Sequence, residues 1–269
     1  MKCTGKRRKK IIKLVALVLA LISLLGPCIS AATYIKRGYS SGCARSIETV
    51  SQTQKKLPIY CVDTKGEKKV AITFDSAWGD EDTGEILTTL KDHEVRATFF
   101  MVGDWIRKYP DLVKRISDEG HDVANHSNKH PHVNQLNKKA IIEDLMEAHA
   151  EIKKITGKDC FLYRPPYGEY NDTVIEAATE CRYHTIQWDV DSIDWKGYDA
   201  PTIVKKVLEH KHLGDGSIIL LHNGAKHTAE ALPRILSGLK EKGYEIVPIS
   251  ELIYTENYSL DHEGRQHLN

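Results

Sequence analysis

The chain has 269 residues, which is enough for one large domain or two small ones. Its 38 lysines and arginines nearly balance its 37 aspartates and glutamates. A balanced charge gives no overall positive field to attract nucleic acid, so we expect no nucleic-acid partner.

The first 32 residues have the layout of an export signal. Basic residues at 6–10 precede an apolar stretch at 14–25, and small residues follow near Ala31. The stretch is short for a membrane-spanning helix, which needs about 20 residues, but counting from Ile11 leaves an uncleaved anchor open. The basic residues hold the N-terminus in the cytoplasm, so we expect the remainder to be exported, either secreted or anchored in the membrane.

Residues 33–68 are polar and lack a clear period, which predicts a spacer before a domain at 69–255. A polar C-terminal tail is expected at 256–269. The exported part contains four cysteines, which an oxidising environment would allow to pair. Cys160 and Cys181 each precede a predicted strand and could be neighbours, and Cys43 could pair with Cys61. Four buried free thiols are the alternative.

Strands and helices alternate from residue 69 onward. The apolar run at 70–74 predicts a buried strand, and Asp82 with Glu85 three residues later predicts the start of a helix. Further strands are expected at 97–102, 121–124, just before Arg164, and at 184–190, 217–221 and 245–247. Further helices are expected from 110 to a stop at Gly120, and at 138–155, 172–181, 201–210 and 228–242. The alternation predicts one α/β domain with a parallel, barrel-like sheet of about seven strands.

Polar residues follow several of the predicted strands. Asp75, His126, Arg164 and His222 each come at or just after the carboxyl end of a strand, as does the segment 189–195. In parallel barrels the catalytic groups lie at this end of the strands. We therefore expect these residues to share one site.

His126 and His130 are four residues apart, with no acidic residue between them. If the backbone makes one turn there, both imidazoles fall on the same side and can reach one cation. The alternative is a pair of surface histidines in a polar loop. The lack of an HExxH motif weighs against an unrelated metallohydrolase.

Five short motifs occur in a fixed order: Thr73-Phe74-Asp75, His126-Ser127-Asn128-Lys129-His130, Arg164-Pro165-Pro166-Tyr167-Gly168, Asp191-Ser192-Ile193-Asp194-Trp195 and Leu220-Leu221-His222. In this order they resemble the motifs of the polysaccharide deacetylase family, also called the NodB homology domain or carbohydrate esterase family 4. The resemblance covers residues 69–254 and implies the family's distorted (β/α) barrel of about seven strands. The first motif looks most like that of the deacetylases of spore-forming bacteria.

The resemblance implies a metal-dependent hydrolase. His126 and His130 would hold a divalent metal, zinc in the first place, with cobalt, nickel or manganese as alternatives. Asp75 would be the general base that takes a proton from the attacking water, and His222 the general acid that protonates the departing amine. Without the family, Asp75 would be interpreted as a turn cap and His222 as a core histidine.

Five further residues have supporting roles in the family. Asp194 would fix the tautomer of the general acid, and Arg164 would keep the general base ionised. Each of these two could otherwise be half of a structural ion pair. The backbone N–H of Tyr167 would bind the oxyanion, while Trp195 and Leu220 would wall the acetyl pocket. A plain core tryptophan is the alternative for Trp195.

The first motif departs from the family pattern at Ser76. The family usually has a second aspartate there, which is the third metal ligand, and a serine hydroxyl is a poor substitute for it. Three outcomes follow: a metal held more weakly by two histidines and water, a replacement ligand such as Asp80, or loss of metal and activity. Retention of the base, the acid and both histidines argues against loss.

Two functions therefore compete. The first is removal of N-acetyl groups from cell-wall polysaccharide, with peptidoglycan as the main substrate, a role in sporulation, and chitin-type oligomers or acetylated xylan as alternative substrates. The second is a catalytically impaired glycan-binding or morphogenetic protein that keeps the fold but lacks the third metal ligand. The expected partners are the cell-wall glycan outside the membrane and, if the leader stays uncleaved, the membrane itself. No protein partner is expected.

Overall fold

The computed structural model describes residues 55–269. The predicted signal at 1–32 and the first part of the predicted spacer lie outside these residues, as does Cys43. Within the described part, no helix is both long enough and apolar enough to cross a membrane.

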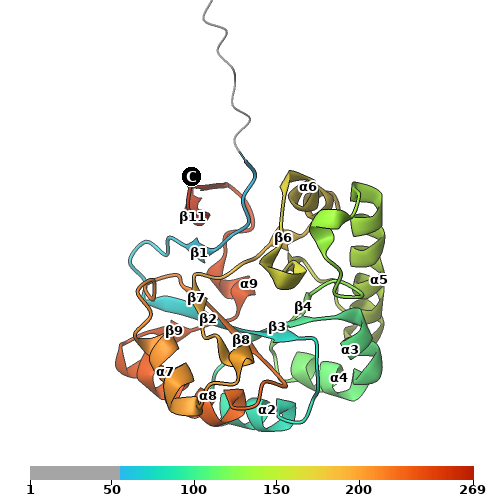
Figure 1. The fold of residues 1–269 in the computed structure, drawn as a ribbon. Coiled ribbons are helices and arrows are strands. Elements are labelled where there is room, and N and C mark those ends of the chain that lie inside the picture. Colours follow the sequence, from blue (N-terminus) through green and yellow to red (C-terminus); the bar gives the residue numbers. More distant parts are fainter. Residues whose placement is uncertain (1–54) are drawn as a thin grey trace, which may run out of the picture. The chain divides into compact units, whose positions relative to one another are not determined.

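A parallel sheet forms the centre of the domain (Figure 1). Its strands are β2 (Lys69–Ser76), β3 (Thr98–Met101), β4 (Asp122–Asn125), β5 (Leu162–Tyr163), β6 (His184–Thr185), β7 (Val190–Asp191), β8 (Ile218–His222) and β9 (Glu245–Ile246). Seven of them follow one another in the order β6-β5-β4-β3-β2-β8-β7, and β9 pairs with the start of β2. Every pairing in this sheet is parallel. Because β6 and β7 end the order without pairing with each other, the described strands form an open, distorted barrel, which confirms the predicted fold class.

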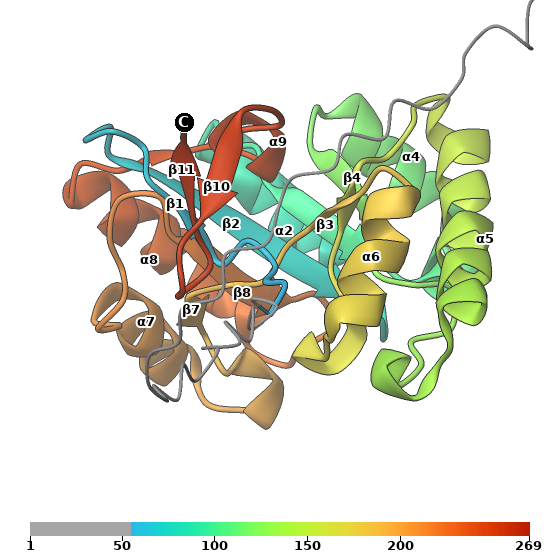
Figure 2. The ribbon, with the colours of Figure 1, turned by 90° about the horizontal axis from the view of Figure 1, so that it is seen from above.

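Helices pack around the sheet in two groups. The helices are α2 (Thr83–Asp92), α3 (Gly103–Lys108), α4 (Pro110–Asp118), α5 (Lys138–Thr156), α6 (Asp172–Glu180), α7 (Ala200–Leu208), α8 (Thr228–Glu241) and α9 (Ile249–Leu252). α8 packs against α2 and α7, whereas α5 packs against α3, α4 and α6. Figure 2 shows α7 and α8 on one side of β2 and β3, and α5 and α6 on the other. Each group buries the apolar side of its helices against the strands.

The side chains of β2 alternate between two hydrophobic cores. Ile72 and Phe74 belong to the larger core, which the helices share, whereas Ala71 belongs to the core inside the barrel. Because successive side chains point to opposite faces of a strand, Asp75 faces the same side as Ala71. The register places Asp75 beside His222 on β8. The strand thus holds Asp75 inside the barrel at its carboxyl end.

The folded domain begins earlier than the predicted boundary at residue 69. Ile59 pairs with Ile186 next to β6, and Cys61 pairs with Ser217 at the start of β8. This segment, which includes the short strand β1 (Cys61–Val62), crosses the open side of the barrel. Ile59 and Val62 are buried in the inner core. The described part of the expected spacer, 55–68, therefore belongs to the domain.

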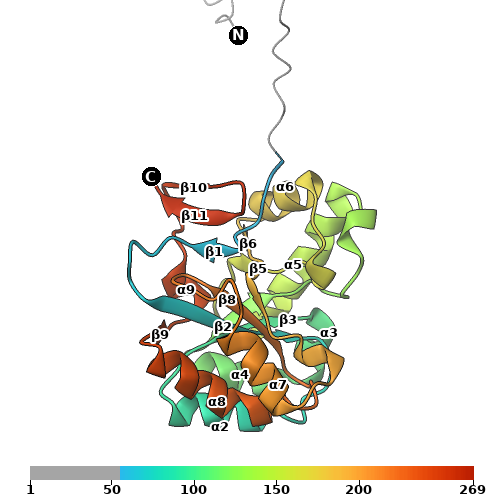
Figure 3. The same cartoon turned by 60° about the vertical axis from the view of Figure 1, so that its left-hand side comes forward.

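The domain also extends through the predicted polar tail at 256–269. β10 (Tyr258–Leu260) and β11 (Arg265–Leu268) pair with each other, and β11 pairs with β1 to complete a three-stranded sheet (Figure 3). Gln266 is fully buried. Its side-chain oxygen accepts the Tyr254 N–H and its side-chain amide donates to the Tyr254 carbonyl, so its polar atoms are satisfied in the core. These strands are polar and lack apolar alternation, so the hydrophobic pattern did not predict them.

Three local features differ from the sequence expectations. The strand expected at 184–190 is interrupted and forms β6 and β7, and α3 was not predicted. Asp82 precedes α2 as predicted, but its side chain makes no capping bond. Its Oδ1 instead accepts the Gly224 N–H at 2.6 Å. A contact between two loops has replaced the local cap.

In the described part of the chain, Cys160 and Cys181 are both free thiols, so the structure does not contain the disulfide bond considered between them. Burial raises the pKa of the Cys160 thiol to about 12, which keeps it protonated and unreactive. Cys43 lies outside the described residues, so a Cys43–Cys61 bond stays a prediction.

Gly216, two residues before β8, packs closely against β1. It has a φ of +80°, and an added Cβ would lie 1.7 Å from the Val62 carbonyl oxygen. We predict that Gly216→Ala lowers the free energy of unfolding by more than about 2 kcal/mol, because a clash adds to the cost of left-handed alanine. Gly157→Ala is the matched control, with a φ of +71° and open space around it, and should cost about 1–2 kcal/mol. Urea unfolding measures both; equal losses would contradict the prediction.

Candidate active site

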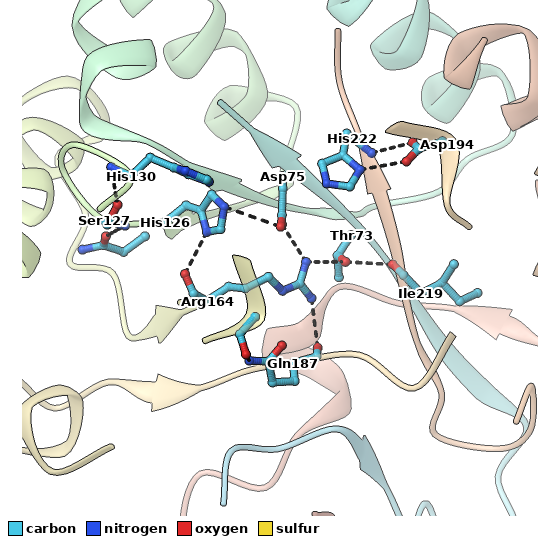
Figure 4. Close-up of polar contacts among 12 residues, drawn as sticks. Thr73, Asp75, His126, Ser127, His130, Arg164, Gln187, Asp194, Ile219 and His222 are labelled. Atoms are coloured by element: carbon cyan, nitrogen blue, oxygen red, sulfur yellow. Dashed lines mark hydrogen bonds and ion pairs between the residues drawn. The ribbon is translucent and has the colours of Figure 1, made fainter. Parts of the chain in front are cut away.

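A buried ion pair lies at the carboxyl end of β2. Arg164 follows β5, and its Nη1 donates to Asp75 Oδ1 at 2.7 Å and to the Thr73 hydroxyl at 2.9 Å (Figure 4). Its Nη2 donates to the Gln187 carbonyl at 3.1 Å, and the Thr73 hydroxyl donates to the Ile219 carbonyl at 2.7 Å. Because Arg164 has no exposed surface, these contacts fix its guanidinium beneath the carboxylate.

Asp75 is ionised despite its burial. Burial alone would raise the pKa of the carboxyl group, but the charge and hydrogen bond of Arg164 outweigh it and hold that pKa below its usual range. The charge of protonated His222 acts in the same direction. The carboxylate is therefore able to accept a proton.

His126 follows β4 and points toward Asp75 (Figure 4). Its Nδ1 lies 2.8 Å from the carbonyl oxygen of Arg164, which can only accept, so Nδ1 carries the proton. Burial lowers the pKa of His126 and keeps the ring neutral. Its Nε2 therefore presents a lone pair 3.6 Å from Asp75 Oδ2. This is the tautomer that a metal-binding histidine uses.

The loop at 127–130 brings His130 next to His126. Ser127 and His130 have φ values of +73° and +54°, which residues other than glycine rarely adopt without support. The Ser127 hydroxyl accepts the His130 N–H at 2.9 Å, and Asp144 on α5 accepts the Asn128 N–H at 2.9 Å. The centroids of the two imidazoles are 4.9 Å apart, and burial lowers the pKa of His130 to about 4. Both rings are neutral at pH 7.

The two histidines offer neutral nitrogens to a cation, but an acidic third ligand is missing. Within residues 55–269, no group of three or more histidines, cysteines or acidic residues could hold a metal ion. Asp80 accordingly forms no such group with His126 and His130. Ser76 is fully buried, and its hydroxyl has no hydrogen-bond partner. The donor set fits a cation held by two histidines and completed by water or substrate.

His222 and Asp194 form a second polar pair on the other side of β2 (Figure 4). His222 Nδ1 lies 2.7 Å from Asp194 Oδ1, and the His222 backbone N–H donates to Oδ2 at 2.8 Å. The Thr228 hydroxyl also donates to Oδ2, at 2.7 Å. Burial alone would lower the pKa of His222, but the hydrogen bond and charge of Asp194, with the charges of Asp75 and Asp191, raise it above its ordinary value. The ring is suited to donate a proton.

Two exposed aromatic side chains lie beside these groups. The ring of Tyr167 lies 4.5 Å from that of His130 and is stacked on His132 at 4.4 Å, and Tyr167 is 59% exposed. Trp195 is 51% exposed, and its backbone N–H donates to Asp194 Oδ1 at 2.8 Å. The alternative of a core tryptophan is therefore wrong for Trp195. Leu220, by contrast, is buried in β8. The roles of Tyr167, Trp195 and Leu220 toward a substrate stay predictions.

Sequence reasoning missed several residues of the site. Thr73 and Gln187 hold the guanidinium, and Trp78 stacks on His222 with ring centroids 5.1 Å apart. The available signal for Trp78 was a large aromatic residue in a polar segment three positions after Asp75. No comparable signal marks Gln187, because it contributes only its backbone carbonyl to the guanidinium.

The chain is similar to proteins of known family. The family model for polysaccharide deacetylase matches residues 62–186. The peptidoglycan-N-acetylglucosamine deacetylase of Bacillus cereus is 36% identical over 191 residues, which cover 70% of this chain and 69% of that protein. The chain belongs to the polysaccharide deacetylase family. The peptidoglycan-N-acetylmuramic acid deacetylase PdaA of Bacillus subtilis is 35% identical over 213 residues, covering 78% and 80% of the two chains. Membership confirms the expectation of a deacetylase-type hydrolase.

A solved structure of the polysaccharide deacetylase family has the same fold. A carbohydrate esterase family 4 pseudoenzyme from Bacillus anthracis aligns with a TM-score of 0.70 at 34% identity, covering 74% of this chain and 69% of that one. A mutant of that protein, described as having restored enzymatic activity, aligns equally well with a TM-score of 0.70. The fold is therefore kept in family members with and without activity.

Arg164→Met would leave the Asp75 carboxylate buried without a partner. We predict that this substitution lowers the free energy of unfolding at pH 7 by about 3–5 kcal/mol. Adding Asp75→Asn should restore a large part of the loss, because a neutral amide removes the uncompensated charge. Urea unfolding of the single and double variants measures both effects. A single variant as stable as the parent would show that the pair does not stabilise the fold.

Proposed function

We propose that the chain removes N-acetyl groups from cell-wall glycan, with peptidoglycan as its substrate. The observation that carries the proposal is the placement of Asp75, kept ionised by Arg164, beside His222, whose protonated form is favoured by Asp194. Amide hydrolysis needs such a base and such an acid in one site. The B. cereus and B. subtilis relatives, both named as peptidoglycan deacetylases, support the substrate class.

The reaction follows from the protonation states of the two residues. A water oxygen attacks the carbonyl carbon of the acetamide while Asp75 takes a proton from that water. The carbon–nitrogen bond then breaks as His222 donates a proton to the departing nitrogen, which leaves acetate and a free amine on the sugar. The Asp194 carboxylate can only accept, so it keeps the proton on His222 Nδ1. Nε2 is therefore the nitrogen that supplies the proton to the leaving group.

We further propose that His126 and His130 hold a divalent metal. Zinc is the favoured metal, with cobalt, nickel or manganese as alternatives. When bound, such a cation polarises the acetyl carbonyl and lowers the pKa of water. Two features support this assignment: both rings are neutral, and the loop is held by backbone hydrogen bonds that the Ser127 hydroxyl and the Asp144 carboxylate accept. Serine at position 76 predicts weaker binding than a second aspartate would give.

The remaining expectations stay part of the proposal. Tyr167 and Trp195 expose rings on which a sugar can stack, with the Tyr167 N–H assigned to the oxyanion and Leu220 to the wall of the acetyl pocket. Export to the cell wall, by a cleaved or anchored leader, rests on the pattern of residues 1–32. A role in sporulation rests on the amino-acid sequence of the first motif alone.

Acetate release from N-acetylated peptidoglycan tests the proposed activity. We expect His222→Ala and Asp75→Asn each to lower kcat by about 10²- to 10⁴-fold, because each removes a proton-transfer group. His262→Ala, which changes a histidine whose side chain is 87% exposed, should leave kcat unchanged. A chelator should abolish the release. No acetate from peptidoglycan, chitin oligomers or acetylated xylan would contradict the proposal.

A catalytically impaired glycan-binding protein is the second candidate function. It is favoured by the absence of an acidic third ligand among the described residues and by the likeness to the B. anthracis pseudoenzyme. The two candidates differ in whether this chain, with serine at position 76, binds enough metal to act.

Ser76→Asp restores the acid that the family usually has. We predict that it tightens zinc binding at least about tenfold, measured by isothermal titration calorimetry. Asp80→Asn, which alters the acid four residues further on, should leave the affinity unchanged. Tighter binding with higher kcat would support a weakly metallated enzyme, whereas tighter binding without any acetate would support the second function. An unchanged affinity would exclude position 76 from the metal site.

A further inference from the structure

Trp78 covers one face of the His222 imidazole. The two rings are stacked, with centroids 5.1 Å apart and planes inclined by 25°. Trp78 is 50% exposed, so the indole is in part open to solvent. Asp194 meanwhile holds the edge of the imidazole through Nδ1. The proton donor is thus held on its edge by a carboxylate and on one face by an aromatic ring.

The loop that carries Trp78 is held by hydrogen bonds from two other elements. Asn223, the residue after His222, is fully buried and donates to the Thr83 hydroxyl at 2.9 Å and to the Gly79 carbonyl at 3.3 Å. The same carbonyl accepts the indole N–H of Trp105 on α3 at 3.1 Å. The loop after β2 is therefore attached to the loop after β8, next to the stacked rings.

The two loops also touch through their backbones. The Gly224 N–H donates to Asp82 Oδ1 at 2.6 Å. Gly224 has a φ of +77°, and an added Cβ would lie 3.1 Å from the Gly79 backbone nitrogen. A side chain at position 224 would therefore push the loops apart. This close fit keeps the indole over the imidazole.

The charges around His222 come from β2, from β7 and from the turn after β7. Asp194 follows β7, Asp75 lies at the end of β2, and Asp191 ends β7; all three favour the protonated ring. His126 on the far side of Asp75 is neutral and adds no charge. The face of an indole is electron-rich and attracts a cation more than a neutral ring. Trp78 thus acts in the same direction as the acids, through the face of the imidazole on which it is stacked.

We propose that Trp78 is a positioning residue for the proton donor: its indole holds one face of the His222 ring and favours the imidazolium. The inference rests on the proposed function only in making His222 the donor to the leaving amine. Without the indole, the ring would lose its proton at lower pH. The alkaline limit of activity would then fall, because the departing nitrogen needs the protonated form.

The test is a pH titration of His222 by two-dimensional NMR of the histidine ring protons, with His222→Gln to assign the signal. We expect Trp78→Leu to lower the titration midpoint by about half a pH unit and Trp78→Phe, which keeps an aromatic face, to lower it less. The control is Phe161→Leu, which removes a ring stacked edge-on to His184, with centroids 6.2 Å apart. It should leave the midpoint of His222 unchanged.

The pH profile of kcat/KM, measured on the same variants, has an alkaline limb. The apparent pKa of that limb should decrease by the same amount as the NMR midpoint. A midpoint in Trp78→Leu equal to that of the parent, in a protein with unchanged thermal unfolding, would overturn the inference. A lowered midpoint in a chain that releases no acetate would support the inference and contradict the proposed function. The two failures are therefore distinguishable.

Discussion

The Arg164 side chain lies without exposed surface between the Asp75 carboxylate, the Thr73 hydroxyl and the Gln187 carbonyl. Its own backbone carbonyl accepts the Nδ1 proton of His126. One residue therefore sets two protonation states: the side chain keeps the base ionised, and the main chain directs the lone pair of a histidine into the site. Both depend on the order of β5, β4, β3 and β2 in the sheet, which places Arg164 next to His126 and within reach of Asp75.

The site is divided by β2. On one side, β4 and β5 contribute His126 and Arg164, and on the other side, β8 and the turn after β7 contribute His222 and Asp194. Asp75 lies between the two halves on β2 itself. The proton donor and the histidine pair are thus held by separate hydrogen-bond networks that meet at one carboxylate. A change in either half can alter its chemistry while the other half keeps its geometry.

The sequence predicted the features that depend on regular patterns. The buried run at 70–74 and the later alternation of strands and helices predicted the parallel sheet, and a parallel sheet places Asp75 and His222 at the same end. It did not predict β10 and β11, whose stability comes from edge pairing and from the side-chain bonds of Gln266 rather than from apolar alternation. Nor did it predict the stacking of Trp78 or the contact of Asp82 with Gly224. These contacts join residues more than 140 positions apart through loop geometry, which has no local signature.

Ser76 has a consequence for how the chain folds. At the carboxyl end of β2, the buried Asp75 carboxylate and the buried Arg164 guanidinium form an ion pair whose charges cancel. A second aspartate at position 76 would bury another negative charge, and an unpaired buried charge is costly unless a cation neutralises it. With serine there, the folded state needs no ion for electrical balance. Folding is then independent of metal supply, so the chain could fold first and acquire a metal afterwards.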